Sequence, residues 1–316
     1  MNEVRTAGEV LARLRGMHGT DPRLSAVDAA VTDRAALIGY LPVGFPTVEQ
    51  SVAAARTLID SGVDILELGL PYSDPVMDGE VIQQAASAAL AGGTRTRHVL
   101  QAVEQLAGHG AAVLVMSYWN PILARGVATF ARDLASAGGA GLITPDLLPE
   151  EASEWIAASD AEGLDRVFLV APNSSGERLV HVSEHCRGFV YAASTMGVTG
   201  ARQDVGSQAE DLVRRTRAAG ADAVCVGLGV SSGEQAAQIA RYADGVIVGS
   251  AFVRCLLEES DPAAGRTRLA ALARDIRAGI DSAGPVDRTP ATTLALGGQS
   301  KAPEPSSLTA SEGTHG

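Results

Sequence analysis

Short apolar runs alternate along the chain with longer segments whose apolar positions recur at helical spacing. The runs, rich in Val, Ile and Leu, predict eight strands: Ala36–Leu41, Asp64–Leu68, Ala112–Ser117, Gly141–Thr144, Arg166–Val170, Gly188–Ala192, Ala223–Gly227 and Gly245–Val248. The amphipathic segments predict intervening helices, among them Glu49–Asp60, Val127–Ala137, Glu150–Ala161, Glu210–Ala219 and Glu234–Arg241. Strands that alternate with helices form a parallel sheet, and eight such units close into a (β/α)8 TIM barrel. The alternative is an open doubly wound sheet, but no GxGxxG motif follows the first strand.

The repeat is extended at both ends of the chain and between the second and third predicted strands. Helical segments outside the plain repeat are predicted at Glu9–Met17, Val81–Ala91 and Ala263–Asp281. From Gly284 onward Pro, Ser, Thr and Gly predominate, a composition typical of disorder. We therefore expect one barrel domain over residues 1–283, including an extra N-terminal helix packed under the barrel, and a disordered C-terminal tail over residues 284–316.

Composition narrows the class of partner and the compartment. Hydrophobic residues make up 46% of the chain and aromatic residues only 4%, as expected for aliphatic strands covered by helices. A net charge of −12 with no basic block argues against nucleic acid or an anionic membrane as partner. No apolar run is long enough to span a bilayer, and Cys186, Cys225 and Cys255 form no CxxC pair. We expect a cytoplasmic protein with reduced thiols.

The distribution of lysine excludes one kind of chemistry. Lys301 is the only lysine, and it lies in the polar tail. A Schiff-base mechanism needs an amine that can lose its proton in a buried site. The folded part of the chain therefore cannot act as a lysine-dependent barrel aldolase, and isomerases that use a lysine in the same fold are excluded with it.

Carboxyl groups stand where the second strand ends. Active sites of such barrels are built at the C-terminal ends of the strands. Glu67 lies inside an apolar run, so its carboxyl either points into the barrel mouth as a catalyst or is buried against a structural partner. Asp74 and Asp78 follow in a loop rich in Pro and Gly, where aspartates form turns or act in catalysis.

Glycine-rich turns follow the last three predicted strands. They are Gly197-Val198-Thr199-Gly200, Gly227-Leu228-Gly229 and Gly249-Ser250. Each can be a simple tight turn, because glycine adopts positive φ at little cost. In many barrels, however, the loops after strands seven and eight hold a phosphate. Gly249 and Ser250 also open a helical segment whose backbone N–H groups would face an anion.

Longer motifs around these residues resemble a known family. The segments are Glu67-Leu68-Gly69, Pro71-Tyr72-Ser73-Asp74-Pro75, Asp78-Gly79, Met116-Ser117-Tyr118-Trp119-Asn120-Pro121, Pro145-Asp146-Leu147, Gly197-Val198-Thr199-Gly200-Ala201 and Gly227-Leu228-Gly229-Val230-Ser231. In this order, over about residues 34–254, they resemble the tryptophan synthase α-subunit family and especially its actinobacterial members. The resemblance implies cleavage of indole-3-glycerol phosphate to indole and D-glyceraldehyde 3-phosphate.

The same resemblance implies a role for each candidate residue. Glu67 would act as acid and base, and Asp78 would accept the indole N–H. The substrate-binding residues would be Tyr191, Thr199, Gly200, Leu228, Gly229, Gly249 and Ser250, with phosphate on the backbone of Gly200, Gly229, Gly249 and Ser250. Thr199 would reach Asp78 when its loop closes. The partner would be a β subunit in an α2β2 heterotetramer, which carries the family's pyridoxal phosphate; this chain would need no cofactor.

Some positions depart from the family pattern. Leu228 replaces a common Phe, Tyr40 begins an unusual turn, and Asn173 stands where Thr or Ser is usual; these changes affect pocket shape and leave both acids in place. The histidines His98, His109, His181 and His185 are expected at surface or helix positions, with no metal. The alternatives are another sugar-phosphate-binding TIM-barrel enzyme and a non-catalytic barrel subunit.

Overall fold

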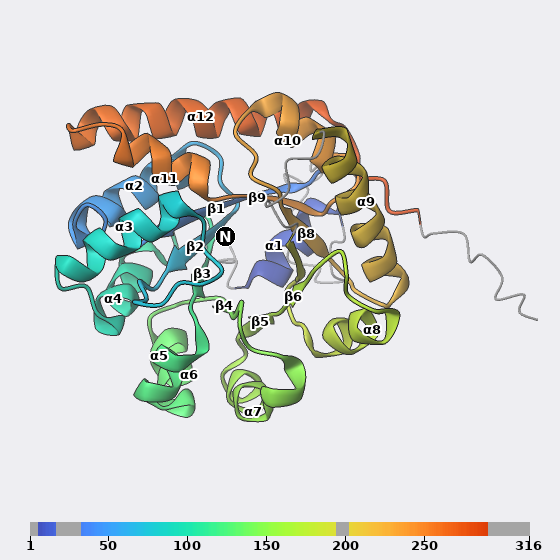
Figure 1. Ribbon diagram of the computed structural model, residues 1–316, viewed down its shortest axis with the longest axis horizontal. Helices are drawn as coiled ribbons and strands as arrows, with labels where there is room; N and C mark the ends of the chain where they lie inside the picture. Colours follow the sequence, from blue (N-terminus) through green and yellow to red (C-terminus); the bar gives the residue numbers. More distant parts are fainter. Residues whose placement is uncertain (1–5, 17–32, 194–201, 290–316) are drawn as a thin grey trace, which may run out of the picture.

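The structure is a computed structural model that describes residues 6–16, 33–193 and 202–289. Within them, parallel strands form one nine-stranded sheet in the order β5-β4-β3-β2-β1-β9-β8-β7-β6. The strands are β1 (Ala36–Pro42), β2 (Ile65–Gly69), β3 (Ala112–Met116), β4 (Gly141–Ile143), β5 (Asp165–Val167), β6 (Leu169–Val170), β7 (Val190–Ala193), β8 (Val224–Gly227) and β9 (Gly245–Val248). The two ends of this order, β5 and β6, are separated in the chain by Phe168 alone, so the sheet curls into a nearly closed barrel (Figure 1).

This arrangement confirms the predicted TIM barrel. The fifth expected strand, Arg166–Val170, is split into β5 and β6. The two pieces pair with different neighbours, β5 with β4 and β6 with β7. The chain thus passes from one edge of the sheet to the other at Phe168, where a continuous strand was expected.

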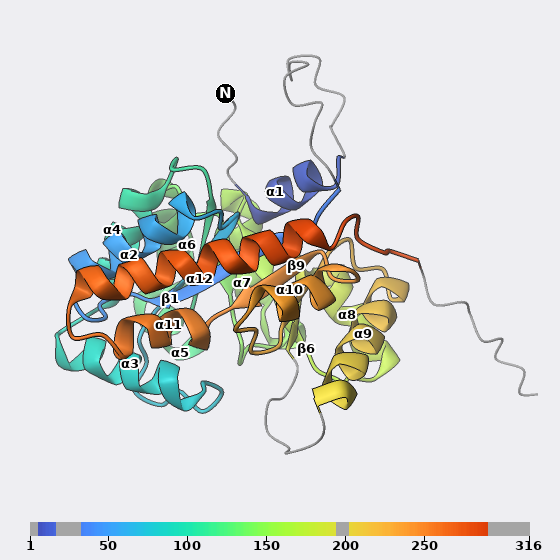
Figure 2. The same ribbon diagram turned by 90° about the horizontal axis from the view of Figure 1, so that it is seen from above.

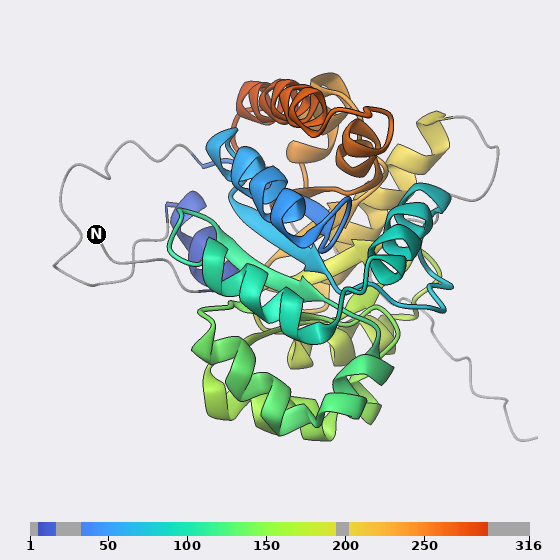
Figure 3. The same ribbon diagram turned by 90° about the vertical axis from the view of Figure 1, so that its left-hand side faces the viewer.

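Helices surround the barrel as an outer layer (Figures 1 and 3). In chain order they are α2 (Val48–Asp60), α3 (Glu80–Ala91), α4 (Thr96–Leu106), α5 (Trp119–Arg125), α6 (Val127–Ser136), the 3-10 turn η2 (Pro149–Glu151), α7 (Ser153–Glu162), α8 (Gly176–His185), α9 (Arg202–Ala218), α10 (Gly233–Ala240), α11 (Ser250–Leu257) and α12 (Pro262–Ser282). None of the described helices has the length and apolar character needed to cross a membrane.

An N-terminal helix, α1 (Ala7–Leu14), closes one end of the barrel, as predicted. Its buried face joins inward-facing strand residues such as Ile38, Ile65 and Leu114 in an interior core. Residues that alternate with these on the strands, such as Leu66, join a second core beneath the outer helices. Figure 2 shows α1 and α3 at opposite ends of the barrel. We call the α1 end the floor and the opposite end, where the strands finish, the mouth.

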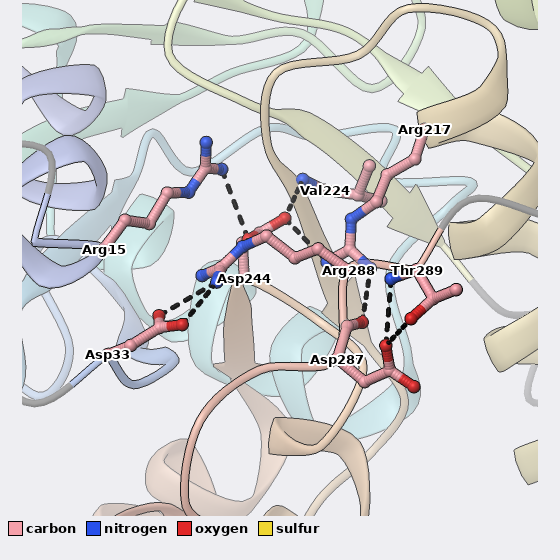
Figure 4. Close-up of polar contacts among 8 residues, drawn as sticks. All are labelled: Arg15, Asp33, Arg217, Val224, Asp244, Asp287, Arg288 and Thr289. Carbon is pink, nitrogen blue, oxygen red and sulfur yellow. Dashed lines mark hydrogen bonds and ion pairs between the residues drawn. The ribbon is translucent and has the colours of Figure 1, made fainter.

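A buried ion-pair network fastens several segments to the floor (Figure 4). Asp244, which precedes β9, has a side chain only 1% exposed. Its carboxylate lies 3.3 Å from Arg15, and it accepts hydrogen bonds from Arg217 at 2.9 Å and Arg288 at 2.8 Å. Burial opposes the charge of Asp244, but Arg15 and Arg217 outweigh it, and the pKa is lowered.

The segment after α12 takes part in this network. Arg288 also bonds to Asp33 at 2.8 Å, and Val286 is buried. The packed chain therefore continues beyond Gly284, where the composition predicted the start of disorder. Ion pairs with groups distant in sequence hold these residues, and local composition does not reveal such pairs. Residues 290–316 of the expected tail lie outside the described part of the chain.

Candidate active site

Glu67 is the central residue of β2, and strand geometry directs its side chain into the barrel. Ile65 belongs to the interior core and Leu66 to the outer core. Because successive side chains of a strand alternate between faces, Glu67 points inward like Ile65, one step closer to the mouth. Its register partners are Tyr40 on β1 and Leu114 on β3. The side chain thus stands above the interior core.

The carboxyl group of Glu67 is buried, and no hydrogen bond from the described residues offsets the loss of water. The residue is 0% exposed, and neither carboxyl oxygen has a hydrogen-bond partner among the described residues. Burial raises the pKa of Glu67 to about 8, because the charged form would lose its hydration without gaining a partner. Glu67 therefore carries its proton at neutral pH and can serve as an acid.

Asp78 lies in the loop after β2, two residues before α3 begins at Glu80. It is partly buried, and this burial raises its pKa to about 6. The two acids therefore differ at neutral pH: Asp78 is mainly ionised, whereas Glu67 is mainly protonated. A pair of carboxyl groups with separated pKa values is the usual arrangement for dividing acid and acceptor roles.

Tyr118 holds the loop that carries Asp78. Its hydroxyl accepts a hydrogen bond from the backbone N–H of Met77 at 2.9 Å. Its ring stacks on Tyr72 with centroids 5.0 Å apart. Gln83 donates to the backbone oxygen of Asp78 at 2.8 Å from the first turn of α3. The loop is thus fixed from both sides next to Asp78. The sequence contained Tyr118 in a family motif, but no periodicity or charge pattern indicated this contact.

Two tyrosines border the acids. Burial raises the pKa of Tyr191, and the negative charges of Glu67 and Asp78 raise it further. The same causes raise the pKa of Tyr40, where the effect of Asp78 exceeds that of Glu67. Both phenols therefore lie within electrostatic range of both acids. Tyr191 was predicted as a site residue. Tyr40 was noted only as part of an unusual turn, although its register beside Glu67 could have indicated it.

Glycines make room for these two rings. A methyl group on Gly69 would overlap the hydroxyl of Tyr40. A methyl group on Gly227 would lie 2.6 Å from the hydroxyl of Tyr191, closer than atoms in contact allow. Each tyrosine ring thus lies against a glycine of the neighbouring strand, and any larger residue there would displace it.

The predicted phosphate residues stand at the ends of β8 and β9. Gly249 is the N-cap of α11 and Ser250 its first residue, with no side-chain cap among the described residues. A Cβ on Gly249 would lie 3.6 Å from the Cβ of Tyr40, so this helix terminus opens beside the tyrosine. Gly229 is exposed with φ +60°, and Leu228 is half-buried against the outer core. Thr199 and Gly200 lie outside the described residues.

These features define a class of enzyme. The mouth of this (β/α)8 barrel brings together three features: the protonated buried acid Glu67, the carboxyl group of Asp78 with its lower pKa, and the N-terminus of α11. The mouth is where this fold carries catalysis. The arrangement suits proton transfer on an anionic substrate.

Comparisons with known proteins identify the family within this class. The family model described as tryptophan synthase alpha chain matches residues 27–281. The tryptophan synthase alpha chain of Acidothermus cellulolyticus is 57% identical over 247 residues, covering 78% of this chain and 92% of that protein. That of Thermobifida fusca is 53% identical over 264 residues, covering 83% and 98%. The chain belongs to the tryptophan synthase alpha chain family, and its enzyme class is that of a lyase.

Solved structures agree with this assignment. A structure of Mycobacterium tuberculosis tryptophan synthase in space group F222 is 54% identical with a TM-score of 0.76, covering 88% of this chain and 99% of that chain. The alpha subunit from Legionella pneumophila is 31% identical with a TM-score of 0.74, covering 88% and 99%. The recognised family, the barrel fold and the lyase class are thereby confirmed.

Proposed function

We propose that Glu67 and Asp78 carry the reaction of this alpha chain, the retro-aldol cleavage of indole-3-glycerol phosphate to indole and D-glyceraldehyde 3-phosphate. The observation that supports this most strongly is the Glu67 carboxyl group, which is fully buried, unpartnered among the described residues and raised in pKa to about 8. Such a group destabilises the fold, so a function is the better reason for its presence, and perturbed acids at a barrel mouth are typical of catalysis.

Glu67 can complete the proton transfers alone. As an acid it donates a proton to carbon 3 of the indole, which makes the ring a good electron acceptor. The bond from carbon 3 to the glycerol side chain then breaks, and its electron pair restores the aromatic ring. The resulting carboxylate takes the proton of the adjacent side-chain hydroxyl, which becomes the aldehyde. Glu67 ends protonated as it began, and no cofactor is consumed.

Asp78 supplies the charge that this path requires. Protonation of carbon 3 places positive charge on the indole nitrogen. An ionised Asp78 accepts the N–H hydrogen bond and stabilises that charge, a contribution of about 10² to 10⁴ in rate. The hydrogen bond that the Met77 N–H donates to Tyr118 and the one that Gln83 donates to the backbone oxygen of Asp78 fix the backbone around this carboxylate before the substrate arrives.

The phosphate end of the substrate would lie toward β8 and β9. The first N–H groups of α11, at Gly249 and Ser250, provide fixed partial positive charge for the anion. Gly229 and the loop residue Gly200 would add further N–H groups, while Tyr191 and Leu228 would shape the walls. Thr199 would reach Asp78 when its loop closes and exclude water.

A β subunit is the proposed partner, in an α2β2 assembly, at the mouth. Val76 is 85% exposed and Met77 is 55% exposed on the Asp78 loop. Large apolar side chains exposed beside a site are typical of an interaction surface. Binding there would couple the partner to the position of Asp78. We place this assembly in the cytoplasm, where the free thiols Cys186, Cys225 and Cys255 would stay reduced.

Release of indole from indole-3-glycerol phosphate, measured with and without a β subunit, tests the proposal. Glu67→Gln keeps the size of the side chain but cannot transfer protons, so turnover should fall by about 10³ or more with little change in substrate affinity. Glu80→Gln is the matched control, because Glu80 is exposed in the first turn of α3 and should tolerate the same change.

The outcomes distinguish the alternatives. If Glu67→Gln turned over at near the wild-type rate, Glu67 would not be the acid. If the wild-type protein released no indole with or without the β subunit, the chain would be a non-catalytic barrel.

A further inference from the structure

The outer face of α8 carries a cluster that the proposed reaction does not use. His181, Glu184 and His185 each offer one ligand atom, and these atoms lie within 4.8 Å of one another. Both histidines are partly buried, and Glu184 is exposed. The imidazole rings lie against each other with centroids 4.4 Å apart. The sequence had suggested surface or helix positions for these histidines, with no metal, and both lie on α8.

The spacing of the three residues suits a metal ion. On a helix, side chains three and four positions apart lie on one face. His181 and His185 stand at i and i+4, the spacing at which helical histidines bind zinc in several enzyme motifs. Metal bonds of about 2.1 Å place ligand atoms about 3.4 Å apart around a tetrahedral ion. Small side-chain rotations on this partly exposed face can close the remaining distance.

The helix itself is well anchored. Ser175 caps its first turn by accepting from the N–H of Arg178, and Leu179 and Val182 are buried beneath it. The face that carries the two histidines is therefore presented by a fixed backbone. A fixed backbone lowers the ordering cost of binding an ion.

Hydrogen bonding also selects the ligand atom of His185. Its Nδ1 lies 2.8 Å from the backbone oxygen of His181. A carbonyl oxygen can only accept, so Nδ1 carries the hydrogen and Nε2 keeps its lone pair. Metal-binding histidines commonly donate their other ring N–H to a carbonyl or carboxylate in this way.

A further carboxylate flanks the cluster. Glu150 of η2 lies 3.6 Å from Nε2 of His181 and is held by Arg178 at 2.9 Å. This position allows Glu150 to orient the His181 ring. Cys186, the next residue along the chain, accepts a hydrogen bond from the N–H of Phe168 through its sulfur at 3.3 Å. That sulfur is therefore directed toward β5 and β6 and is not part of the cluster.

We propose that His181, Glu184 and His185 bind one divalent transition-metal ion of the zinc class. Two imidazoles and one carboxylate favour such an ion over calcium or magnesium, which prefer oxygen ligands alone. With three protein ligands the site leaves a position for water, so it should bind more weakly than a closed structural zinc site. α8 belongs to the outer helical layer (Figure 1), and the cluster lies on its C-terminal half, which precedes β7. The proposed metal site is therefore outside the barrel, apart from Glu67 in its interior.

Zinc titration of a tag-free, chelator-treated protein against a chromophoric zinc chelator tests the proposal. The wild-type protein should bind one equivalent. His181→Ala and His185→Ala should each weaken zinc binding at least tenfold. Glu184→Gln should weaken it less, and because Glu184 is exposed this variant does not disturb packing. His109→Ala is the matched control, since His109 is exposed and belongs to no such group among the described residues.

A second measurement guards against indirect effects. Zinc should raise the thermal midpoint of the wild-type protein and of Cys186→Ser, but not that of His185→Ala. Indole release should be unchanged by His185→Ala. The proposal is wrong if the wild-type protein binds no zinc, or if both histidine variants and Glu184→Gln bind it as tightly as the wild type. If the wild-type protein released no indole, that result would count against the proposed function and not against the metal site.

Discussion

Glu67 at the mouth and Asp244 at the floor are both buried carboxyl groups, yet they differ in the charged partners around them. Glu67 is fully buried with no partner among the described residues, and its pKa rises to about 8. Asp244 is equally buried, but three arginines surround it and its pKa falls. Burial disfavours the charged form of both carboxyl groups, so the neighbouring charged groups decide whether the pKa rises or falls. The floor stabilises the fold, whereas the mouth keeps a destabilising acid.

The largest effect should come from the pH dependence of folding stability at Glu67. The pKa of a free glutamic acid is near 4.5, and that of Glu67 in the folded state is about 8. The folded state therefore holds the proton more tightly, and stability is lost as pH rises from 4.5 through 8. Glu67→Gln stays neutral throughout, so it should exceed the wild type by up to about 5 kcal/mol at pH 9 and match it near pH 4.

Urea unfolding of wild type and Glu67→Gln across this pH range provides the measurement. Parallel profiles, with a constant difference from pH 4 to pH 9, would show that the Glu67 carboxyl is solvated or paired in the folded protein. Glu80→Gln should follow the wild-type profile.

At the floor, Asp244→Asn should lower the free energy of unfolding by about 3 to 5 kcal/mol, because it leaves buried arginines without their counter-charge. The amide can still accept from the N–H of Val224, which Asp244 does at 3.0 Å, so packing is retained. Asp211→Asn on α9 removes an exposed partner of Arg215 and should cost less than about 1 kcal/mol. Denaturant unfolding of both variants makes the comparison. Equal small losses would mean that the floor network does not hold the fold together.

The pH dependence of kcat/KM should show the ionisation of both Glu67 and Asp78. Indole release requires Glu67 protonated and Asp78 ionised, so kcat/KM should fall below about pH 6 and above about pH 8, roughly tenfold per pH unit on each limb. In Asp78→Asn the residual activity should lose the acid limb and keep the alkaline one. A flat profile between pH 5 and pH 9 would contradict the assignment of both roles.

The smallest effect should come from Tyr118, which positions the Asp78 loop. Tyr118→Phe removes the acceptor for the Met77 N–H at constant ring size. Loss of one such hydrogen bond, worth about 1 kcal/mol, should lower kcat about fivefold with little change in KM. Tyr72→Phe keeps the ring stack and should retain the wild-type rate. If both variants behaved alike in kcat, the hydroxyl of Tyr118 would have no special role.

Local pattern was enough for the repeat of strands and helices and for the position of Glu67 inside a buried strand, although the structure puts it at the centre of β2 and the sequence had put it near the strand's end. The alternation of apolar and polar residues is a property of neighbours in the chain, and a carboxyl group inside a Val/Leu/Ile run is visible without a structure. The motifs that resemble the family likewise extend along continuous segments. Tyr40 and Tyr118 were not singled out, because their importance depends on contacts with residues on other strands and loops.

What the sequence by itself determined is therefore the barrel and its N-terminal helix, and through its family motifs it indicated Glu67 and Asp78 as the proposed acids. Only the tertiary structure decided that Glu67 lacks a partner while Asp244 has three, since desolvation and charge depend on groups brought together from distant segments. Arg15, Arg217 and Arg288 stand far apart in the chain, and nothing in their local sequence indicates a shared carboxylate. Folding alone places them within reach of Asp244 and leaves Glu67 without a hydrogen-bond partner in the described part of the chain.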